Sequence, residues 1–191
     1  MTLETSKAYR RRFSREEIYT GIFRGYGIDI GGGSDPLRST WFSGVKAVHN
    51  FDLPDGDAQD ITKYVKEQFD FVYSSNCLEH MADPVKALVG WWELVKPDGH
   101  LVLIVHDEDM YEQGFWPSRW NGDHKHTFTV FKDASWSPVS VNLAPLWQIL
   151  PGARLVHIRM ADYGWKPGMR GIDQTFPEDG AEAFIEMVLR K

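Results

Sequence analysis

Apolar runs alternate with polar, turn-rich stretches along the chain, and this pattern predicts strands alternating with helices. Between residues 85 and 95 the pattern favours a helix, and Asp83-Pro84 before it is typical of a first helical turn. Short apolar runs bounded by turn residues predict strands at 26–30, 45–51, 71–73, 101–105, 154–160 and 183–190. The order of these elements predicts an α/β fold.

The first two dozen residues differ from the rest because they are polar and rich in Arg and Glu, which favours helix. Ser14-Arg15-Glu16-Glu17 matches the capping box that begins many helices, so we expect a second helix to start at Ser14. Residues 1–24 are therefore predicted to form a helical cover. This cover either closes a ligand pocket as a lid or protects an edge of the sheet.

Composition restricts the class of protein. A chain of 191 residues with 42% hydrophobic and 25% charged residues is expected to form one soluble domain, residues 1–191. The single cysteine, Cys77, excludes an intramolecular disulfide and fits a reducing cytoplasm. The longest apolar run, residues 101–105, is too short to cross a bilayer, and no signal peptide is visible. We therefore expect a cytoplasmic protein without membrane insertion. A net charge of −6 argues against a nucleic-acid partner.

A glycine turn directly follows the first predicted strand. Gly31, Gly32 and Gly33 can adopt positive φ and carry no Cβ atoms, so a ligand can approach the backbone closely. A dinucleotide site would need a third glycine at position 36, which is Pro36. An NAD-dependent oxidoreductase is therefore disfavoured.

The segment Asp29-Ile30-Gly31-Gly32-Gly33 instead resembles the first motif of the class I S-adenosylmethionine (SAM)-dependent methyltransferases. In that family the acid and the glycines hold the amino-acid end of SAM, so the resemblance implies that Asp29 and the three glycines bind the cofactor. Asp52 ends the second predicted strand about 20 residues later, where an acid can accept hydrogen bonds from the ribose. An alternative is that Asp52 only forms the turn with Pro54.

Three later segments extend this resemblance. Asp57-Ala58 is similar to the motif that meets the adenine ring, and Leu78-Glu79-His80 before Asp83-Pro84 looks like the fourth motif, which follows a loop containing Ser75 and Asn76. Lys96-Pro97-Asp98-Gly99 resembles the family's Leu-Lys-Pro-Gly-Gly element. The resemblance implies that Asp57, Ala58, Ser75 and Asn76 contact SAM, whose product is S-adenosylhomocysteine (SAH). The Asn/Asp-Pro-Pro-aromatic motif of adenine-N6 DNA methyltransferases is missing.

The family implies a Rossmann-like three-layer sandwich with a mostly parallel sheet and an antiparallel last strand. This chain departs from the family after the second strand. Only four residues separate Asp52 from Asp57, whereas a parallel crossover needs a dozen or more. We therefore predict that the third strand is reduced or absent and that residues 61–68 form the crossover helix.

Methyl transfer is an in-line displacement, so alignment of the reactants is the main task and can supply about 7–11 kcal/mol. A hydroxyl acceptor also needs a base. His124, His80 and His106 are the candidate catalytic bases, and His126 is a weaker one; each could instead have only a structural role. A metal site is not expected, because the spacing of Asp107, Asp109, His124 and His126 matches no ligand pattern.

Residues 106–141 are predicted to be a long irregular loop on the substrate side. Trp116 and Trp120, with Trp136 and Asp107, would give this loop flat apolar faces with polar edges, which suit sugar rings or other small metabolites. The sequence therefore predicts a SAM-dependent methyltransferase acting on a small-molecule or glycan acceptor, with a hydroxyl oxygen as the target. A non-catalytic SAM- or nucleotide-binding partner protein is the alternative. The acceptor and the oligomeric state stay open.

Overall fold

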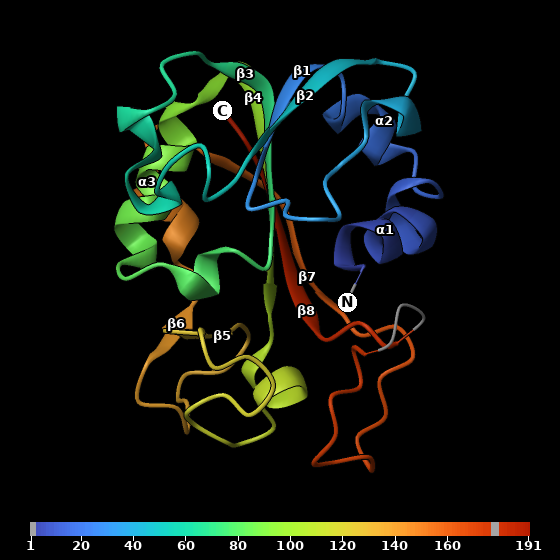
Figure 1. Cartoon of the computed structure of the whole chain (residues 1–191), viewed down its shortest axis with the longest axis vertical. Coiled ribbons are helices and arrows are strands. Elements are labelled where there is room, and N and C mark those ends of the chain that lie inside the picture. The colour runs from blue at the N-terminus through green and yellow to red at the C-terminus, as the bar shows by residue number, and fades with distance from the viewer. Residues whose placement is uncertain (1–2, 177–179) are drawn as a thin grey trace.

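The computed structural model describes residues 3–176 and 180–191. Residues 1 and 2 of the predicted N-terminal cover, and residues 177–179 between the last two predicted strands, lie outside the described residues. The main sheet has six strands in the order β2-β1-β3-β4-β8-β7 (Figure 1). Their bounds are β1 (Gly25–Ile30), β2 (Val45–Phe51), β3 (Phe69–Ser75), β4 (Val95–His106), β7 (Arg154–Ala161) and β8 (Phe184–Arg190).

The first four strands of the order pair in parallel, and β8 pairs antiparallel with both β4 and β7. The predicted sheet with an antiparallel closing pair is therefore confirmed. Helices lie on both of its faces, which gives three layers (Figure 1). Residues 71–73 of β3 and 101–105 of β4 are hydrophobic and buried, as expected for a parallel sheet covered on both sides.

The predicted loss of the third strand is confirmed, because β2 is the edge strand. The crossover helix predicted at 61–68 is wrong. The chain instead passes through the 3-10 helix η3 (Ala58–Lys63), which is kinked at Asp60 with φ −121° and ψ 38°. This short connection is held by the indole of Trp91, whose Nε1 donates to the carbonyl of Ala58 at 2.9 Å. Burial of Ile61 against the helix α3 (Pro84–Glu93) completes the contact.

The helix α3 forms as predicted, with Pro84 in its first turn. Asp83 is the N-cap and its Oδ1 accepts a hydrogen bond from the backbone N–H of Lys86 at 2.9 Å. Its apolar side chains Leu88, Trp91 and Trp92 are buried against the sheet. The helix ends at Glu93, two residues before the predicted end at Val95, because β4 already begins at Val95.

The N-terminal segment covers the opposite face of the sheet. It consists of α1 (Glu4–Ala8), the π-helix η1 (Tyr9–Phe13) and α2 (Ile18–Ile22). Phe13 and Phe23 pack on Tyr73 of the sheet. The predicted capping box at Ser14 is wrong: α2 begins at Ile18 and has no side-chain cap. Because η1 extends the first helix to Phe13, Ser14 is its C-cap instead.

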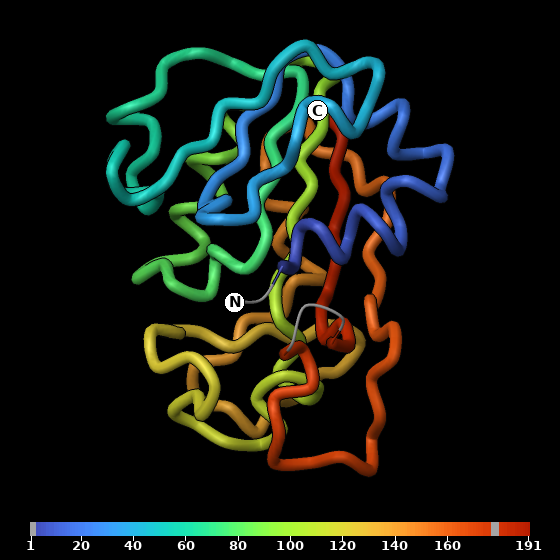
Figure 2. The backbone as a smooth tube through the Cα atoms, turned by 45° about the vertical axis from the view of Figure 1, so that its right-hand side comes forward, coloured from blue at the N-terminus to red at the C-terminus, as the bar shows by residue number. Residues whose placement is uncertain are grey.

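Most of the region 106–141 has no regular secondary structure, but short elements interrupt it. It holds the π-helix η5 (Glu108–Glu112) and the strand β5 (Thr127–Thr129), which pairs in parallel with β6 (Ser140–Asn142). Phe128 is fully buried in the main hydrophobic core, which fastens this region to the sheet. It lies beyond the carboxyl ends of β3 and β4, beside the chain between β7 and β8 (Figure 2). In the described residues no helix is both long and apolar enough to cross a membrane.

Candidate active site

The glycine turn after β1 packs too tightly to hold side chains. Gly31 has φ +79°, and a Cβ atom there would lie 2.5 Å from Sγ of Cys77. A Cβ on Gly32 would lie 2.4 Å from Oδ1 of Asn50. Gly33 also has positive φ, at +52°. The turn is therefore held against its neighbours on one side and is open to a ligand on the other.

Asp29 lies behind this turn, fully buried. Its Oδ2 accepts a hydrogen bond from the backbone N–H of Leu37 at 2.7 Å, which fixes the path of the chain after the glycines. Burial raises the pKa of Asp29 to about 7, against the lowering effect of that hydrogen bond. The carboxylate belongs to the walls of neither cavity described next. Its Oδ1 is buried and has no hydrogen-bond partner in the protein, so the role of Asp29 in cofactor binding stays a prediction.

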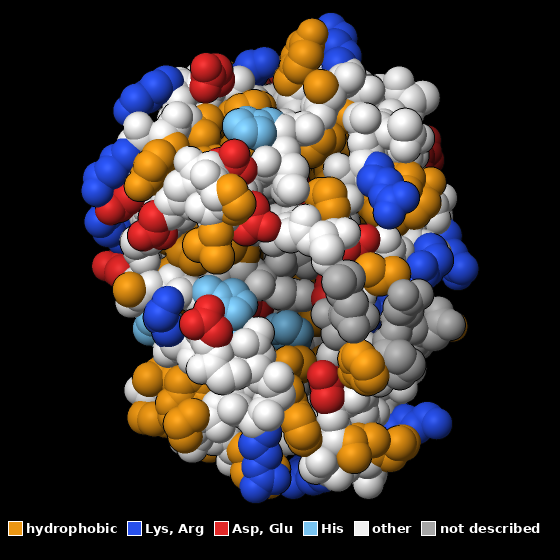
Figure 3. Space-filling view, in the orientation of Figure 1, with side chains coloured by type: hydrophobic (Ala, Val, Ile, Leu, Met, Phe, Trp, Pro, Cys, Tyr) orange, Lys and Arg blue, Asp and Glu red, His pale blue; other side chains and the backbone are white. Residues whose placement is uncertain are grey.

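Two cavities meet at the turn and share Gly31, Gly33 and Asn76. The outer cavity, of about 490 Å³, is lined by Asp52, Asp57, Ala58 and His80 among others. The inner cavity has about 230 Å³. Its remaining walls come from Glu4, Thr5, Gly32, Ser34, Asp35, Ser75, His106, Tyr111, Asn121, His124 and Thr175. A recess with histidine side chains at its border is visible on one face of the molecule (Figure 3).

The outer cavity contains the predicted residues beyond β2. Asp52 is half-buried, and its Oδ1 accepts from the N–H of Leu53 at 2.8 Å. The carboxylate of Asp57 is occupied as the cap of η3, where it accepts from the N–H of Gln59 at 2.9 Å. Ala58 is beside it in the cavity wall. Each of the two carboxylates thus accepts one backbone hydrogen bond, and Asp52 is the more buried of the two.

Ser75 and Asn76 stand at the carboxyl end of β3, between the two cavities. Both polar atoms of the Asn76 amide are buried, as is Oγ of Ser75, and the protein gives none of them a hydrogen-bond partner. Asn76 also has φ +53°. Buried polar groups are nearly always satisfied, and strained backbone collects at functional sites, so these atoms are suited to contact a ligand.

His124 lines the inner cavity with a side chain that is almost fully buried. Its Nδ1 lies 2.8 Å from Oε1 of Glu112, and the two side chains are 1% and 2% exposed. Nε2 is buried and has no partner in the protein. The turn after η5 brings Glu112 and His124 together. The ring therefore offers one oriented nitrogen to whatever occupies the cavity.

A second pair lies beside it. Nδ1 of His106 is 3.3 Å from Oε1 of Glu79, outside hydrogen-bond geometry, while the backbone N–H of His106 donates to the same oxygen at 2.6 Å. Burial lowers the pKa of His106, more than Glu79 raises it. Burial acts to raise the pKa of Glu79, but His106 and then His124 outweigh it, so this carboxyl stays ionised. Tyr111 stacks on the His106 ring, with centroids 3.7 Å apart.

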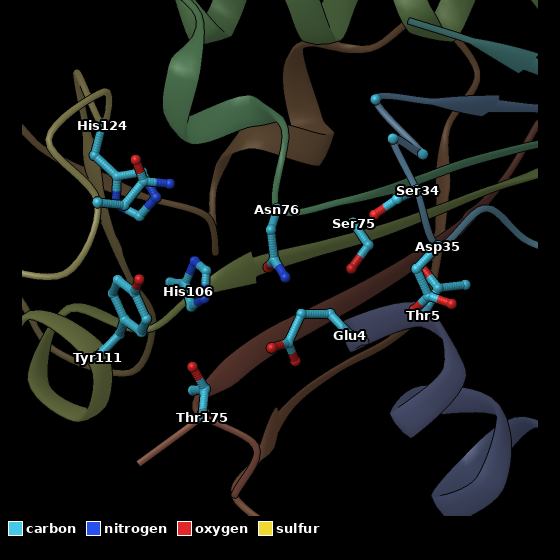
Figure 4. Close-up of a pocket in the computed structure, with 14 residues that line it drawn as sticks. Glu4, Thr5, Ser34, Asp35, Ser75, Asn76, His106, Tyr111, His124 and Thr175 are labelled. Carbon is cyan, nitrogen blue, oxygen red and sulfur yellow. The ribbon is translucent and has the colours of Figure 1, made fainter. Parts of the chain in front are cut away.

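Figure 4 shows how these side chains face one another. His124, His106 and Tyr111 gather on one side of the inner cavity, and Asn76 stands between them and Ser75 (Figure 4). Glu4 from α1 and Thr175 reach in from a different direction. Burial raises the pKa of Glu4 to about 7 despite its contact with Lys7. The N-terminal segment therefore covers a face of the sheet and also borders the cavity.

The three predicted bases are placed differently. His124 and His106 line the inner cavity, whereas His80 lines the outer one, with Nδ1 3.0 Å from Oδ2 of Asp123. His126 lines neither, and its ring nitrogens contact the carbonyls of Val139 and Ala82. Glu79 and Glu112 were not predicted as site residues. Glu79 adjoins His80 in the fourth motif, but no sequence signal links Glu112 to His124.

The residues predicted for the acceptor lie elsewhere. Trp116 and Trp120 line neither cavity, and the Nε1 of Trp120 donates to the carbonyl of Tyr111 at 2.8 Å. Asp107 caps η5 by accepting from the N–H groups of Asp109 and Met110, both at 3.0 Å. Burial raises its pKa to about 6. In the described part of the chain, no three His, Cys, Asp or Glu side chains are placed to hold a metal ion.

Part of the chain matches a known protein family. Residues 18–103, which contain the glycine turn, Asp52 and Asn76, match a family model described as "Methyltransferase domain". This match identifies residues 18–103 as a methyltransferase domain. No curated protein matches the sequence.

Solved structures resemble this methyltransferase domain in fold. A protein from Bacillus halodurans assigned as a methyltransferase has a TM-score of 0.61 and 15% identity, covering 95% of this chain and 99% of that one. A SAM-dependent methyltransferase from Clostridium acetobutylicum has a TM-score of 0.59 and 9% identity, covering 100% and 92%. The N-methyltransferase NodS from Bradyrhizobium japonicum has a TM-score of 0.56 and 14% identity, covering 98% and 94%. These levels of identity establish a shared fold.

Proposed function

We propose that this methyltransferase transfers the methyl group of SAM to a hydroxyl oxygen of a small-molecule or saccharide acceptor, with His124 as general base. The observation that carries the proposal is the buried, unpartnered Nε2 of His124 in the wall of the inner cavity. Its Nδ1 is held by the buried carboxylate of Glu112. A histidine whose Nδ1 is held by a carboxylate is oriented so that its Nε2 can accept a proton.

The two cavities suit the two ends of the reaction. In the outer cavity Asp52 has the capacity to accept two hydrogen bonds from ribose hydroxyls, and the wall at Ala58 suits the adenine. The glycine turn and the unpartnered amide of Asn76 fit the amino-acid end, where the cavities join. The acceptor would then occupy the inner cavity beside His124.

The chemistry follows from this placement. SAM supplies a methyl group on a sulfonium, and the electron pair of the broken carbon–sulfur bond stays on sulfur. Nε2 of His124 takes the proton of the acceptor hydroxyl as its oxygen forms the new bond to carbon. Glu112 stabilises the resulting imidazolium. The products are a methyl ether and SAH, and the proton leaves His124 for solvent. Positioned proton transfer of this kind contributes roughly 10²–10⁴-fold to rate.

The cofactor half of the proposal is tested by calorimetric titration with SAM, SAH and NADH. We expect micromolar binding of SAM and SAH and none of NADH. Failure of SAM and SAH to bind would overturn the proposal, including its non-catalytic alternative.

The catalytic half is tested by SAH formation over a panel of alcohols, saccharides, amines and thiols. We expect acceptor-dependent SAH from hydroxyl compounds, and a loss of at least about 100-fold in His124→Asn. His126→Asn is the matched control, since that ring lies in the same region outside both cavities. SAH formation that depends on amines alone, or that survives in His124→Asn, would contradict the role of a base.

A further inference from the structure

Two histidine–glutamate pairs face the same small cavity. In one, Glu112 holds Nδ1 of His124; in the other, Glu79 lies 3.3 Å from Nδ1 of His106. The carboxyl groups are buried, with side chains 2% and 1% exposed. In both rings Nδ1 is directed to protein, so Nε2 is the polar atom left for a ligand. A reaction that removes one proton needs only one such ring.

The spacing of the rings fits one small molecule. The centroids of His106 and His124 are 5.4 Å apart, and their planes differ by 41°. Tyr111 is packed against both, at 3.7 Å and 5.5 Å, which fixes the two rings relative to each other. Both rings line the same inner cavity. An acceptor bound at His124 can therefore also reach His106.

The charges around the inner cavity indicate which acceptor groups suit it. Burial lowers the pKa of His106, which favours the uncharged ring, and such a ring can exchange a hydrogen bond with a neutral oxygen. Among the 14 residues that line the inner cavity there is no lysine or arginine, while Glu4 and Asp35 are present. A phosphate or carboxylate close to the reacting atom would lack a cationic partner. The lining therefore favours uncharged hydroxyl groups.

We propose that the acceptor presents two adjacent hydroxyl groups to this cavity, a 1,2-diol, with one hydroxyl at His124 for methylation and its neighbour hydrogen-bonded to His106. This inference rests on the proposed function. It makes His106 a specificity-determining residue and not a second base. Recognition of the diol by the two rings also replaces the tryptophan platform that the sequence predicted, since Trp116 and Trp120 line neither cavity.

The test uses the full chain saturated with SAH and three probes that share a ring: cyclohexanol, cis-cyclohexane-1,2-diol and cis-cyclohexane-1,3-diol. Saturation-transfer difference NMR compares their binding. We expect the 1,2-diol to bind at least about fivefold better than the other two, since one additional good hydrogen bond contributes about 1 kcal/mol. In His106→Asn the three probes should bind within about twofold of one another. His126→Asn should keep the preference for the 1,2-diol.

Equal binding of the three probes, no binding of any of them, or a preference that survives in His106→Asn would each overturn the inference. If His106→Asn does not fold, His106→Gln serves as the second variant, with the thermal midpoint as the check on folding. The SAM titration separates this failure from that of the proposed function. A protein that binds SAM and methylates isolated hydroxyls keeps the proposed function and loses only the diol.

Discussion

The carboxylate of Glu112 and the imidazole of His124 are joined by a contact of 2.8 Å between Oε1 and Nδ1, shielded from solvent on both sides. This contact lets Glu112 act as a positioning residue for His124. Glu112→Gln keeps an acceptor oxygen but loses the charge that stabilises the imidazolium. We expect kcat to fall by about 10- to 100-fold with the KM for SAM unchanged. Steady-state kinetics of SAH formation measures both; a change confined to KM would argue against this role.

The close contact of Gly31 with Cys77 predicts an effect on cofactor binding. In Gly31→Ala the new methyl group would meet Sγ of Cys77 at 2.5 Å, at a backbone φ of +79°. We expect a loss of about 1–3 kcal/mol in unfolding free energy and at least tenfold weaker SAM binding. Gly21→Ala is the control, because a Cβ atom there would meet nothing within 4 Å beyond its own helix and chain neighbours. Urea denaturation and calorimetry report the two effects; unchanged SAM affinity in Gly31→Ala would contradict the placement of the cofactor at the turn.

Asp52 and Asp57 both line the outer cavity, yet only Asp52 is expected to bind SAM through its side chain. Loss of hydrogen bonds to a charged acceptor costs about 1.5–3 kcal/mol each, so Asp52→Ala should weaken SAM binding by at least about tenfold. Asp57→Ala removes the cap of η3 and should change SAM affinity by less than about threefold. Calorimetry measures the dissociation constant of SAM for each variant. The reverse order of effects would move the ribose site to Asp57.

The buried Glu186 of β8 predicts how stability depends on pH. Its carboxylate accepts from Arg12, Arg159 and His157, at 3.0, 3.0 and 2.9 Å. Burial acts to raise the pKa of Glu186, but these partners outweigh it and lower the pKa to about 2. A pKa below the unfolded value stabilises the folded state above about pH 4.5, and this contribution is lost as the pH falls toward 2.

Glu186→Gln should therefore lower stability near pH 7 by roughly 1–3 kcal/mol, because the charged partner of Arg12 and Arg159 is lost while Arg12 keeps Glu182 and Arg159 keeps Glu16. The difference from the wild type should narrow as the pH falls below about 4.5. Thermal unfolding from pH 7 to pH 3 measures it. A difference independent of pH would show that the charge of Glu186 is not the cause.

The sheet could be predicted well because it depends on local sequence motifs and on the number of residues between its strands. Asp83-Pro84 marks the start of α3, and the glycine turn marks the end of β1. The four residues between Asp52 and Asp57 are too few for a crossover, which is why the missing strand could be predicted. The helix expected at 61–68 failed because the local cap at Asp57 and the kink at Asp60 favour 3-10 turns.

The site could be predicted only where it follows the strands. Ser75 and Asn76 lie at the end of β3, so topology places them. Glu112 ends the π-helix η5 and meets His124 12 residues later, after an irregular stretch. The direction of a tryptophan side chain in such a region depends on tertiary packing. Trp120 donates to the carbonyl of Tyr111 and lines neither cavity, and its predicted contact with the acceptor stays a prediction.

The most direct test of hydroxyl-directed methyl transfer identifies the atom that receives the methyl group. The protein is incubated with SAM carrying a ¹³C-labelled methyl group and a small-molecule metabolite extract, and the products are examined by ¹³C NMR. We predict a new methoxy signal that is present with the wild type and His126→Asn and is lost with His124→Asn. Label found only in N-methyl or S-methyl signals, or a methoxy signal that persists in His124→Asn, would contradict the account.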